Sequence, residues 1–366
     1  MIYFAVDEPR IALLNHYLAR NSGQPICDCL RQVSYPDLFR TRTLARGAWI
    51  FTSLDALSDA ELRMVHYLQT AARSAGLPVL NSAREALCRY RLLQLLHRAG
   101  LNSFQAHRAD GPLAAVRFPV FVRLAGEHNG SLTPLLYNRA ELLSAMGYLW
   151  MRGLPRRHLL VVEFCETAGA DGLYRKYSIF RIGNTCVPRY LHIGPHWMTK
   201  SGTRHVEERL VLEEIAYLRE NPHAAWASQV FEMAHIEYGR LDYGVREGRP
   251  QAWEINFTPF LAGNPGRPAG TPEDQRMREL TRAPKEYAHA ALREAFQRID
   301  PGPIPGAEVR AEFPPGLEDQ ARRERSAIQA LERRQLWISK VTAVPGIRAV
   351  RPWVQRTLEG LYPRVR

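Results

Sequence analysis

The chain has no long apolar segment. Its 366 residues contain no run that approaches the ~18–20 apolar residues an α-helix needs to span a bilayer. The first residues, Met-Ile-Tyr-Phe-Ala-Val-Asp-Glu, have neither a basic stretch nor a long apolar stretch, which favours a first β-strand over a secretory signal peptide. The sequence therefore predicts a cytoplasmic protein without a membrane span.

Cysteine is also scarce. The five cysteines are irregularly spaced, which argues against a disulfide framework. The one close pair, Cys27 and Cys29, lacks the second pair or the histidines that a structural zinc site requires. The sequence also lacks a Gly-x-Ser-x-Gly motif and a Cys/His signature, so we expect chemistry that uses no nucleophilic side chain.

Lysine is scarce as well. The net charge is +12, yet only four of the 49 basic residues are lysines, and the arginines are scattered along the chain. A nucleic-acid binder usually gathers its basic residues in a patch or a known motif. A scattered basic surface attracts ATP, acidic peptides or anionic membranes equally well.

Three regions follow one another along the chain. Residues 1–80 alternate strand and helix patterns, which predicts a small open α/β domain. Residues 81–299 carry further strands and helices, with a distinct part at about 101–165. Residues 300–366 begin with a Pro/Gly-rich linker and continue as a basic, amphipathic helical extension. This extension could bind nucleic acid or lie on an anionic membrane surface, or pack against the main body.

A hairpin with an acidic face is the most informative local feature. We predict strands at 236–245 and 251–256, joined by a turn at 246–250 that contains Gly248 and Pro250. Side chains two apart on a strand point to the same face. The hairpin therefore places three oxygen-bearing side chains on one face: Asp242, Glu254 and Asn256.

Such a set of hard oxygen ligands suits Mg²⁺, which usually binds through one or two carboxylates plus substrate phosphates. An ordinary hairpin with polar residues on its wet face is the alternative. A second feature favours the metal site. An apolar strand at 118–124 is followed by a loop at 125–131 that contains glycine, and a return strand is expected at 132–137. Loops of this kind can close over phosphates with their backbone amides.

The order of these pieces resembles the ATP-grasp superfamily of carboxylate–amine and carboxylate–thiol ligases, which includes glutathione synthetase and D-alanine–D-alanine ligase. The resemblance covers residues 80–266 approximately, and its most specific local match is Glu254-Ile255-Asn256. It implies an α/β ATP-grasp fold. A pre-ATP-grasp domain would occupy residues 1–80, and the catalytic region 81–299 would include a nucleotide-binding lid at about 101–165.

The resemblance also implies roles for individual residues. Arg123 stands where the family usually has a phosphate-binding lysine, and Arg240 stands near the transferred phosphate. Lys176, preferred over its neighbour Arg175, would contact the phosphates, and Lys200 would lie in a loop that closes over the nucleotide. The predicted metal ligands are Asp242, Glu254 and Asn256. The predicted phosphate-covering loop consists of His128, Asn129, Gly130 and Ser131. The predicted adenine hinge consists of Glu163, Phe164 and Cys165. In this hinge, backbone groups of Phe164 and Cys165 would pair with the base edge, and Glu163 would accept from its amino group.

The function implied is an ADP-forming carbon–nitrogen ligase. It would use ATP and Mg²⁺, with Mn²⁺ as a further candidate ion, and would join a carboxylate to an amine through an acyl phosphate. An amino acid, a peptide or a glycan acid is the expected kind of substrate. Two alternatives stay open: a catalytically silent ATP-binding or scaffold protein, and a nucleic-acid or membrane-surface binder that acts through the basic extension. The oligomeric state is not predicted.

Overall fold

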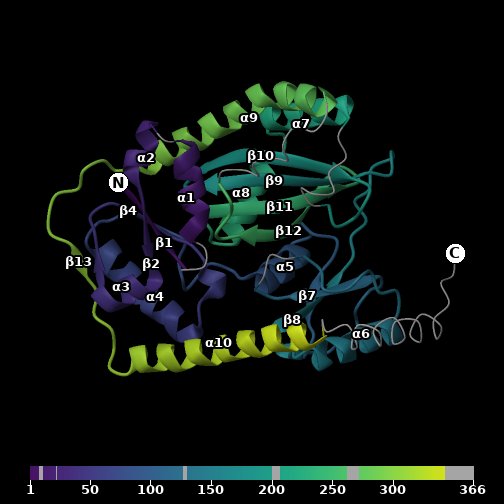
Figure 1. The fold of residues 1–366 in the computed structure, drawn as a ribbon, viewed down its shortest axis with the longest axis horizontal. Coiled ribbons are helices and arrows are strands. Elements are labelled where there is room, and N and C mark those ends of the chain that lie inside the picture. Colours follow the sequence, from purple (N-terminus) through teal and green to yellow (C-terminus); the bar gives the residue numbers. More distant parts are fainter. Residues whose placement is uncertain (8–10, 22, 127–129, 200–206, 262–271, 343–366) are drawn as a thin grey trace.

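The computed structural model describes residues 1–342 except 8–10, 22, 127–129, 200–206 and 262–271. Within this part of the chain, strands form one parallel four-stranded sheet, one antiparallel four-stranded sheet, one three-stranded sheet and one two-stranded sheet. Figure 1 shows the parallel sheet on one side and the other two large sheets stacked beside it. The mixed α/β fold predicted from the sequence is confirmed. No described helix is both long and apolar enough to cross a membrane.

The first unit is a parallel sheet of order β2-β1-β4-β5. Its strands are β1 (Ile2–Val6), β2 (Leu30–Ser34), β4 (Ala48–Phe51) and β5 (Val79–Leu80). Its helices are α1 (Ile11–Arg20), α2 (Pro25–Cys29), α3 (Tyr35–Thr41) and α4 (Asp59–Ser74). The sequence did not predict β2, because a five-residue edge strand with polar residues inside it has no clear alternation.

Helix α4 begins with Ser58 as its N-cap, and the Ser-x-x-Glu spacing of Ser58 and Glu61 predicts a capping box. The Ser58 hydroxyl accepts a hydrogen bond from the Glu61 N–H at 3.3 Å, and the Glu61 carboxylate accepts one from the Ser58 N–H at 2.8 Å. This reciprocal capping box satisfies two of the N–H groups that a helix start leaves without partners.

The second unit is the antiparallel sheet, of order β10-β9-β11-β12. Its strands are β9 (Tyr174–Ile182), β10 (Thr185–Gly194), β11 (Tyr238–Arg246) and β12 (Arg249–Asn256). Its helices are α7 (Glu208–Glu220), α8 (Ala224–Met233) and α9 (Pro272–Ile299), of which α7 and α9 pack against β10 and against each other. Figure 1 shows these two helices along the β10 side of the sheet.

The third unit is a small antiparallel sheet of order β6-β8-β7. It contains β6 (Ala106–Arg108), β7 (Val120–Leu124) and β8 (Leu159–Glu163), with helices α5 (Arg89–Arg98) and α6 (Arg139–Met151). The return strand predicted at 132–137 was wrong, because that segment makes only an isolated bridge from Leu136 to Val120. Pro134 has no N–H to donate to a ladder, and the Thr133 hydroxyl instead accepts a hydrogen bond from the Val122 N–H at 3.0 Å.

One buried side chain connects the first two units. Asn81 is fully buried, and its side-chain amide donates to the carbonyls of Phe51 on β4 and Tyr238 on β11. Its carbonyl oxygen accepts from the N–H groups of Glu237 and Tyr238. A buried amide with all these bonds made holds the two sheets at a defined spacing, and so holds the β11–β12 hairpin in place.

The C-terminal region returns to the first unit. Strand β13 (Val309–Arg310) pairs with β3 (Thr43–Leu44), and α10 (Leu317–Thr342) lies along α4. Leu317 and Ala321 of α10 pack against Ala60 and Met64 of α4. Of the fates considered for the basic extension, the described part of α10 therefore packs on the main body. Residues 343–366 lie outside the described residues.

Candidate active site

The acidic hairpin forms one edge of the site. Asp242 on β11 is directly opposite Glu254 on β12, and Arg240 is opposite Asn256. The shared face that alternation predicts is therefore present. The turn is shorter than predicted: Pro250 belongs to β12, and the two residues between the strands, Glu247 and Gly248, both have positive φ. That is the two-residue turn that matches the natural twist of a hairpin.

Asp242 is almost completely buried and is held by two cations. Its carboxylate accepts from the Arg240 guanidinium at 2.8 and 3.1 Å, and Lys176 Nζ lies 2.7 Å away. Burial would raise the pKa of Asp242, but the charges of Arg240 and Lys176 outweigh it and lower the pKa. Burial would likewise lower the pKa of Lys176, but Asp242 outweighs it and raises the pKa. Both groups are therefore charged at neutral pH.

Lys176, not Arg175, faces the site. Arg175 lies on the other face of β9, where it bonds Asp171 and Glu213. The strict alternation of a strand predicted that only one of these two neighbours could serve the site.

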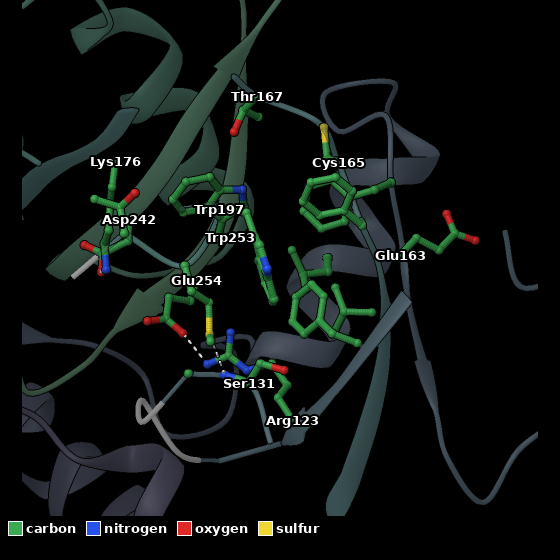
Figure 2. A pocket seen from close by; sticks show the side chains of 18 of the residues that line it. Arg123, Ser131, Glu163, Cys165, Thr167, Lys176, Trp197, Asp242, Trp253 and Glu254 are labelled. Atoms are coloured by element: carbon green, nitrogen blue, oxygen red, sulfur yellow. Dashed lines mark hydrogen bonds and ion pairs between the residues drawn. The ribbon is translucent and has the colours of Figure 1, made fainter. Parts of the chain in front are cut away.

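Glu254 is held by a second pair of cations. Its Oε2 accepts from Arg89 Nη2 and from Arg123 Nη2, each at 2.7 Å. Arg123 comes from β7 and Arg89 from the first turn of α5, so the hairpin carboxylate joins two other elements (Figure 2 labels Arg123 and Glu254). Burial lowers the pKa of Arg89, although the charge of Glu254 opposes that effect. A guanidinium stays charged in either case.

Sequence reasoning missed Arg89. The residue begins a leucine-rich helix, and no motif marks it. Its burial is visible only in the structure, where it is 7% exposed and needs a partner because an unpaired buried charge is costly. Its other bonds go to the carbonyls of Leu124 and Ala125, at the start of the predicted phosphate loop.

The described part of the site is therefore electropositive. Four cations surround the two carboxylates, and the charge of Asp55 also acts on Arg89, so the cations outnumber the carboxylates. The four cationic residues are Arg89, Arg123, Lys176 and Arg240. All are at least three-quarters buried, so bulk water screens their charges weakly.

A cavity of about 390 Å³ opens beside these charges. Its polar end holds Arg123, Lys176, Asp242 and Glu254. Its other end is apolar and aromatic, lined by Leu93, Phe104, Phe121, Val162, Phe164, Trp197 and Trp253. Figure 2 shows Trp197 and Trp253 between the two carboxylates and Cys165. A pocket with an aromatic end and a cationic end suits a ligand that is itself flat at one end and anionic at the other.

The predicted phosphate loop is described only in part. Gly130 and Ser131 line the cavity, whereas His128, Asn129 and Lys200 lie outside the described residues. The Ser131 hydroxyl bonds the carbonyls of Val122 and Thr133, at 3.2 and 2.6 Å, and its N–H points to the Met198 sulfur at 3.3 Å. Ser131 therefore shapes the loop where it approaches the residues that follow β10.

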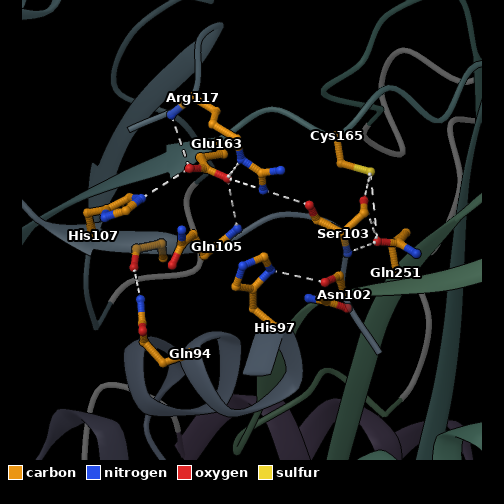
Figure 3. Close-up of polar contacts among 11 residues, drawn as sticks. Gln94, His97, Asn102, Ser103, Gln105, His107, Arg117, Glu163, Cys165 and Gln251 are labelled. Atoms are coloured by element: carbon orange, nitrogen blue, oxygen red, sulfur yellow. Dashed lines mark hydrogen bonds and ion pairs between the residues drawn. The ribbon is translucent and has the colours of Figure 1, made fainter. Parts of the chain in front are cut away.

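The predicted role of the Glu163 side chain requires correction. Figure 3 shows its carboxylate among His107, Gln105 and Arg117, and Figure 2 shows it directed away from the cavity. It accepts from Arg117 Nη2 at 2.6 Å, from Arg117 Nε at 3.0 Å, from the Arg117 N–H at 3.1 Å and from the Gln105 N–H at 3.3 Å, and it lies 3.2 Å from His107 Nε2. Glu163 is among the residues that line the cavity, but its carboxylate would have to exchange these partners in order to accept from a base there.

The other hinge residues line the cavity with some groups already bonded. The Phe164 N–H donates to the Pro119 carbonyl at 2.9 Å, which removes it from the groups expected to pair with a base. Cys165 is buried, and its sulfur lies 3.3 Å from the Ser103 hydroxyl. Burial raises the pKa of the Cys165 thiol, so it is a neutral group at the rim of the cavity.

The carboxylates fit a magnesium ion that is shared with phosphates. No cluster of three or more Asp, Glu, His or Cys residues suited to a metal occurs in the described ranges. The site instead offers two carboxylates directly opposite each other, which is the number that Mg²⁺ uses when substrate phosphates and water complete its shell. The Asn256 oxygen accepts from the Thr258 N–H at 2.8 Å, so it would have to exchange that bond to bind a metal.

Comparisons with known proteins return structures only. No protein-family model matches the chain, and no curated protein matches its sequence. The structure is similar to the D-alanine–D-alanine ligase of Coxiella burnetii (TM-score 0.45, 11% identity, 90% of this chain and 98% of that chain covered). It is also similar to an L-amino acid ligase of Bacillus licheniformis (TM-score 0.41, 13% identity, 81% and 74% covered) and to a RimK domain ATP-grasp protein of Sphaerobacter thermophilus (TM-score 0.40, 15% identity, 80% and 98% covered).

Similarity at this level concerns the arrangement of helices and strands, and the chemistry has to come from the side chains of the site.

Proposed function

We propose that this chain is an ATP- and Mg²⁺-dependent ligase that joins a carboxylate to an amine through an acyl phosphate. One observation carries the proposal. Asp242 and Glu254 are paired across the hairpin, are each held by two buried cations, and lie at the polar end of an aromatic cavity. An ordinary solvent-exposed hairpin face would not need buried arginines from α5 and β7.

The electrostatics favour a polyanion. An excess of positive charge in a site shielded from water favours binding of a triphosphate, because Coulomb interactions grow as the local dielectric constant falls. On nucleotide binding, the guanidinium and ammonium groups would exchange part of their contact with the carboxylates for phosphate oxygens. Arginine suits this exchange, since its planar fork matches carboxylate and phosphate equally well.

Asp242 and Glu254 are the residues that would hold the ion. When bound, Mg²⁺ would neutralise charge on the β- and γ-phosphate oxygens. The two carboxylates already sit at adjacent positions with cationic partners, so the chain needs no large rearrangement of its backbone to present them. The same residues would serve for Mn²⁺.

The side chains supply positioning and charge, and the substrates supply the reacting atoms. A substrate carboxylate oxygen attacks the γ-phosphorus of ATP, the bond to the bridging oxygen breaks, and ADP leaves. An amine nitrogen then attacks the acyl carbon, and inorganic phosphate leaves with the electron pair of the C–O bond. Arg123, Lys176 and Arg240 would stabilise the negative charge in the first step.

The choice of acid and amine is proposed only as a class. The excess positive charge favours an anionic substrate, such as an amino acid, a peptide or a glycan acid. We propose the cytoplasm as the place of action, because the reaction consumes ATP.

An ADP-release screen tests the function. The purified chain is incubated with ATP, Mg²⁺ and pairs of carboxylates and amines drawn from amino acids and peptides, and ADP is measured together with the condensed product. We expect ADP release that depends on both substrates, and its loss in the variants Asp242→Asn and Glu254→Gln. Glu247→Gln is the matched control, because this residue lies in the turn of the same hairpin with 80% of its side chain exposed.

Full turnover in either site variant would refute the assignment of the carboxylates. Tight binding of Mg·ATP without ADP release for any substrate pair would point instead to the catalytically silent ATP-binding protein. Thermal unfolding of each variant has to accompany the assay, because Asp242→Asn leaves Arg240 and Lys176 without their counter-charge.

A further inference from the structure

Helix α6, on the third unit, is apolar on two opposite faces. One face, with Leu142, Met146 and Leu149, is buried in the core of that unit. The other face, here called the α6 face, consists of Leu143, Gly147, Trp150 and Met151. On this second face the leucine, the tryptophan and the methionine are 51%, 69% and 64% exposed. A surface helix normally carries polar residues on its outer side, so an apolar outer side indicates a surface that another segment covers.

Gly147 lies at the centre of the α6 face. Glycine inside a helix is destabilising relative to alanine. A Cβ at Gly147 would meet no atom within 4 Å in the described part of the chain, so packing within that part does not require glycine here. The missing side chain leaves a notch between Leu143 and Trp150, which suits the close approach of another segment.

The C-terminal helix α10 points beyond the start of α4. The two helices are antiparallel, because Gln320 bonds Arg63 whereas Arg325, further along α10, bonds Glu61 in the first turn of α4. Residues 326–342 of α10 therefore extend past α4 by about 25 Å of helix. Figure 1 shows α10 running from α4 toward the third unit.

The start of α4 is also the end that faces the third unit. The chain enters α4 from the short helix η2 (Leu54–Ala56), and the Asp55 carbonyl in η2 would lie 3.2 Å from a Cβ at Gly126, just after β7. The charge of Asp55 likewise acts on Arg89 at the start of α5. Helix α10 thus leaves α4 on the side where the first and third units meet.

The chain continues beyond α10 with residues 343–366, which lie outside the described residues. Even as a helix, a segment of this length would span about 36 Å. Apolar residues recur in its sequence every three or four positions, at Ile347, Val350, Val354, Leu358 and Leu361. This spacing is typical of one helix face, which is stable in water only when it packs on another apolar surface.

From these observations we propose that residues 343–366 pack on the α6 face and thereby tie the third unit to the first. Arg325 and Glu324 anchor α10 on α4, so a C-terminal segment held on α6 would connect the two units from outside the cavity. The proposal goes beyond the proposed function and does not depend on it, because no nucleotide takes part in the contact.

Hydrogen exchange of the full chain, read by mass spectrometry without nucleotide, tests the contact. Leu143→Asp places a charge on the α6 face. Leu212→Asp is its matched control, because Leu212 is likewise the fifth residue of its helix, α7, and is also 51% exposed. Leu358→Asp changes the apolar stripe of the C-terminal segment, and Gln355→Asp is the control there. A synthetic peptide of residues 343–366 gives the exchange rate of the free segment.

We expect amides of residues 343–366 to exchange more slowly in the unmodified chain than in the peptide, to the same extent at every protein concentration. Leu143→Asp and Leu358→Asp should each speed this exchange about tenfold or more, the size expected when one leucine contact is lost. Leu212→Asp and Gln355→Asp should match the unmodified chain. Exchange in β7 and β8 should be equal in all five proteins, which shows that the third unit itself stays folded.

Four results would overturn the proposal. In the first, the segment exchanges as fast in the unmodified chain as in the peptide. In the second, Leu143→Asp and Leu212→Asp have the same effect, so the segment packs elsewhere. In the third, protection grows with protein concentration together with a dimer in sedimentation, so a second copy covers the α6 face. In the fourth, protection appears only with phosphatidylglycerol vesicles, so the partner is a membrane.

Discussion

Arg123 Nη2 on β7 and Glu254 Oε2 on β12 lie 2.7 Å apart, which joins the three-stranded sheet to the antiparallel sheet through one ion pair. The two residues were predicted separately, one for phosphate and one for metal. Their contact brings the two sets of predicted residues together at one end of the cavity. Because Arg89 binds the same oxygen, the carboxylate also fixes the start of α5.

Arg123→Lys tests whether the guanidinium fork matters at this point. Lysine keeps the charge but has neither the reach nor the planar donors of arginine. A hydrogen bond to a charged group is worth about 1.5–3 kcal/mol, so we expect substrate-dependent ADP release to fall roughly tenfold or more. In Arg123→Gln, substrate-dependent ADP release should fall further, because glutamine lacks the charge. Steady-state kinetics at saturating ATP provide the measurement.

Arg108→Lys serves as the control for that substitution. Arg108 pairs with Asp110 on the surface, with 46% of its side chain exposed, and should tolerate lysine. Turnover of Arg123→Lys equal to that of this control would contradict a role for the fork.

Arg89→Gln should lower the free energy of unfolding. Removing one member of a buried ion pair costs about 3–5 kcal/mol, and the remaining Arg123 contact should bring the loss to the lower part of that range. Urea unfolding followed by circular dichroism gives the value. In an Arg89→Gln, Glu254→Gln double variant the cost of losing Arg89 should shrink, because no buried carboxylate is left short of a partner. Strictly additive losses would show that the two residues do not interact.

The lowered pKa of Glu163 predicts that the free energy of unfolding depends on pH. Burial would raise its pKa, but the bonds from His107 and Arg117 outweigh burial and lower the pKa from the ordinary 4.5 to about 2. A group whose pKa is depressed in the folded chain stabilises it above the unfolded pKa and loses that contribution as pH falls through the folded pKa. The contribution at neutral pH is roughly 3 kcal/mol, taken from the size of the shift.

The measurement compares the unmodified chain with Glu163→Gln by urea unfolding between pH 7 and about pH 3. The difference between them should be largest at pH 7 and should shrink below about pH 4.5, where the unfolded chain takes up the proton. Glu247→Gln, in the exposed hairpin turn, should follow the unmodified chain throughout. A difference that stays constant over this range would refute the proposed charge contact.

Helix α10 should stabilise the start of α4. Arg325 donates to both oxygens of Glu61, at 2.8 and 2.7 Å, and Glu324 accepts from the Ala60 N–H at 2.8 Å. Arg325→Ala should cost about 1–2 kcal/mol, because Glu61 is also a capping residue of α4. Arg322→Ala should cost at most about 0.5 kcal/mol, since Arg322 pairs with Asp319 on the exposed face of the same helix. Equal effects of the two substitutions on the urea midpoint would contradict a docking role for Arg325.

The sequence by itself determined the features that depend on near neighbours. Alternation along two strands was enough to place Asp242 and Glu254 on one face, and to predict that Lys176 and Arg175 lie on opposite faces of their strand. Spacing was likewise enough for the capping box of Ser58 and Glu61. These rules act over a few residues, so they hold whatever the rest of the chain does.

Only the tertiary structure decided the partners of those residues. Arg89 is 165 positions from Glu254, and Arg123 is 131 positions from it, and no local rule connects them. The outward direction of Glu163 and the inward position of Trp197 depend on how the three-stranded sheet packs over the antiparallel one. A buried charge pairs with whichever opposite charge the packing of the fold brings near it. The sequence therefore supplied the charged groups, and the packing of the sheets decided which of them are buried and which of them pair.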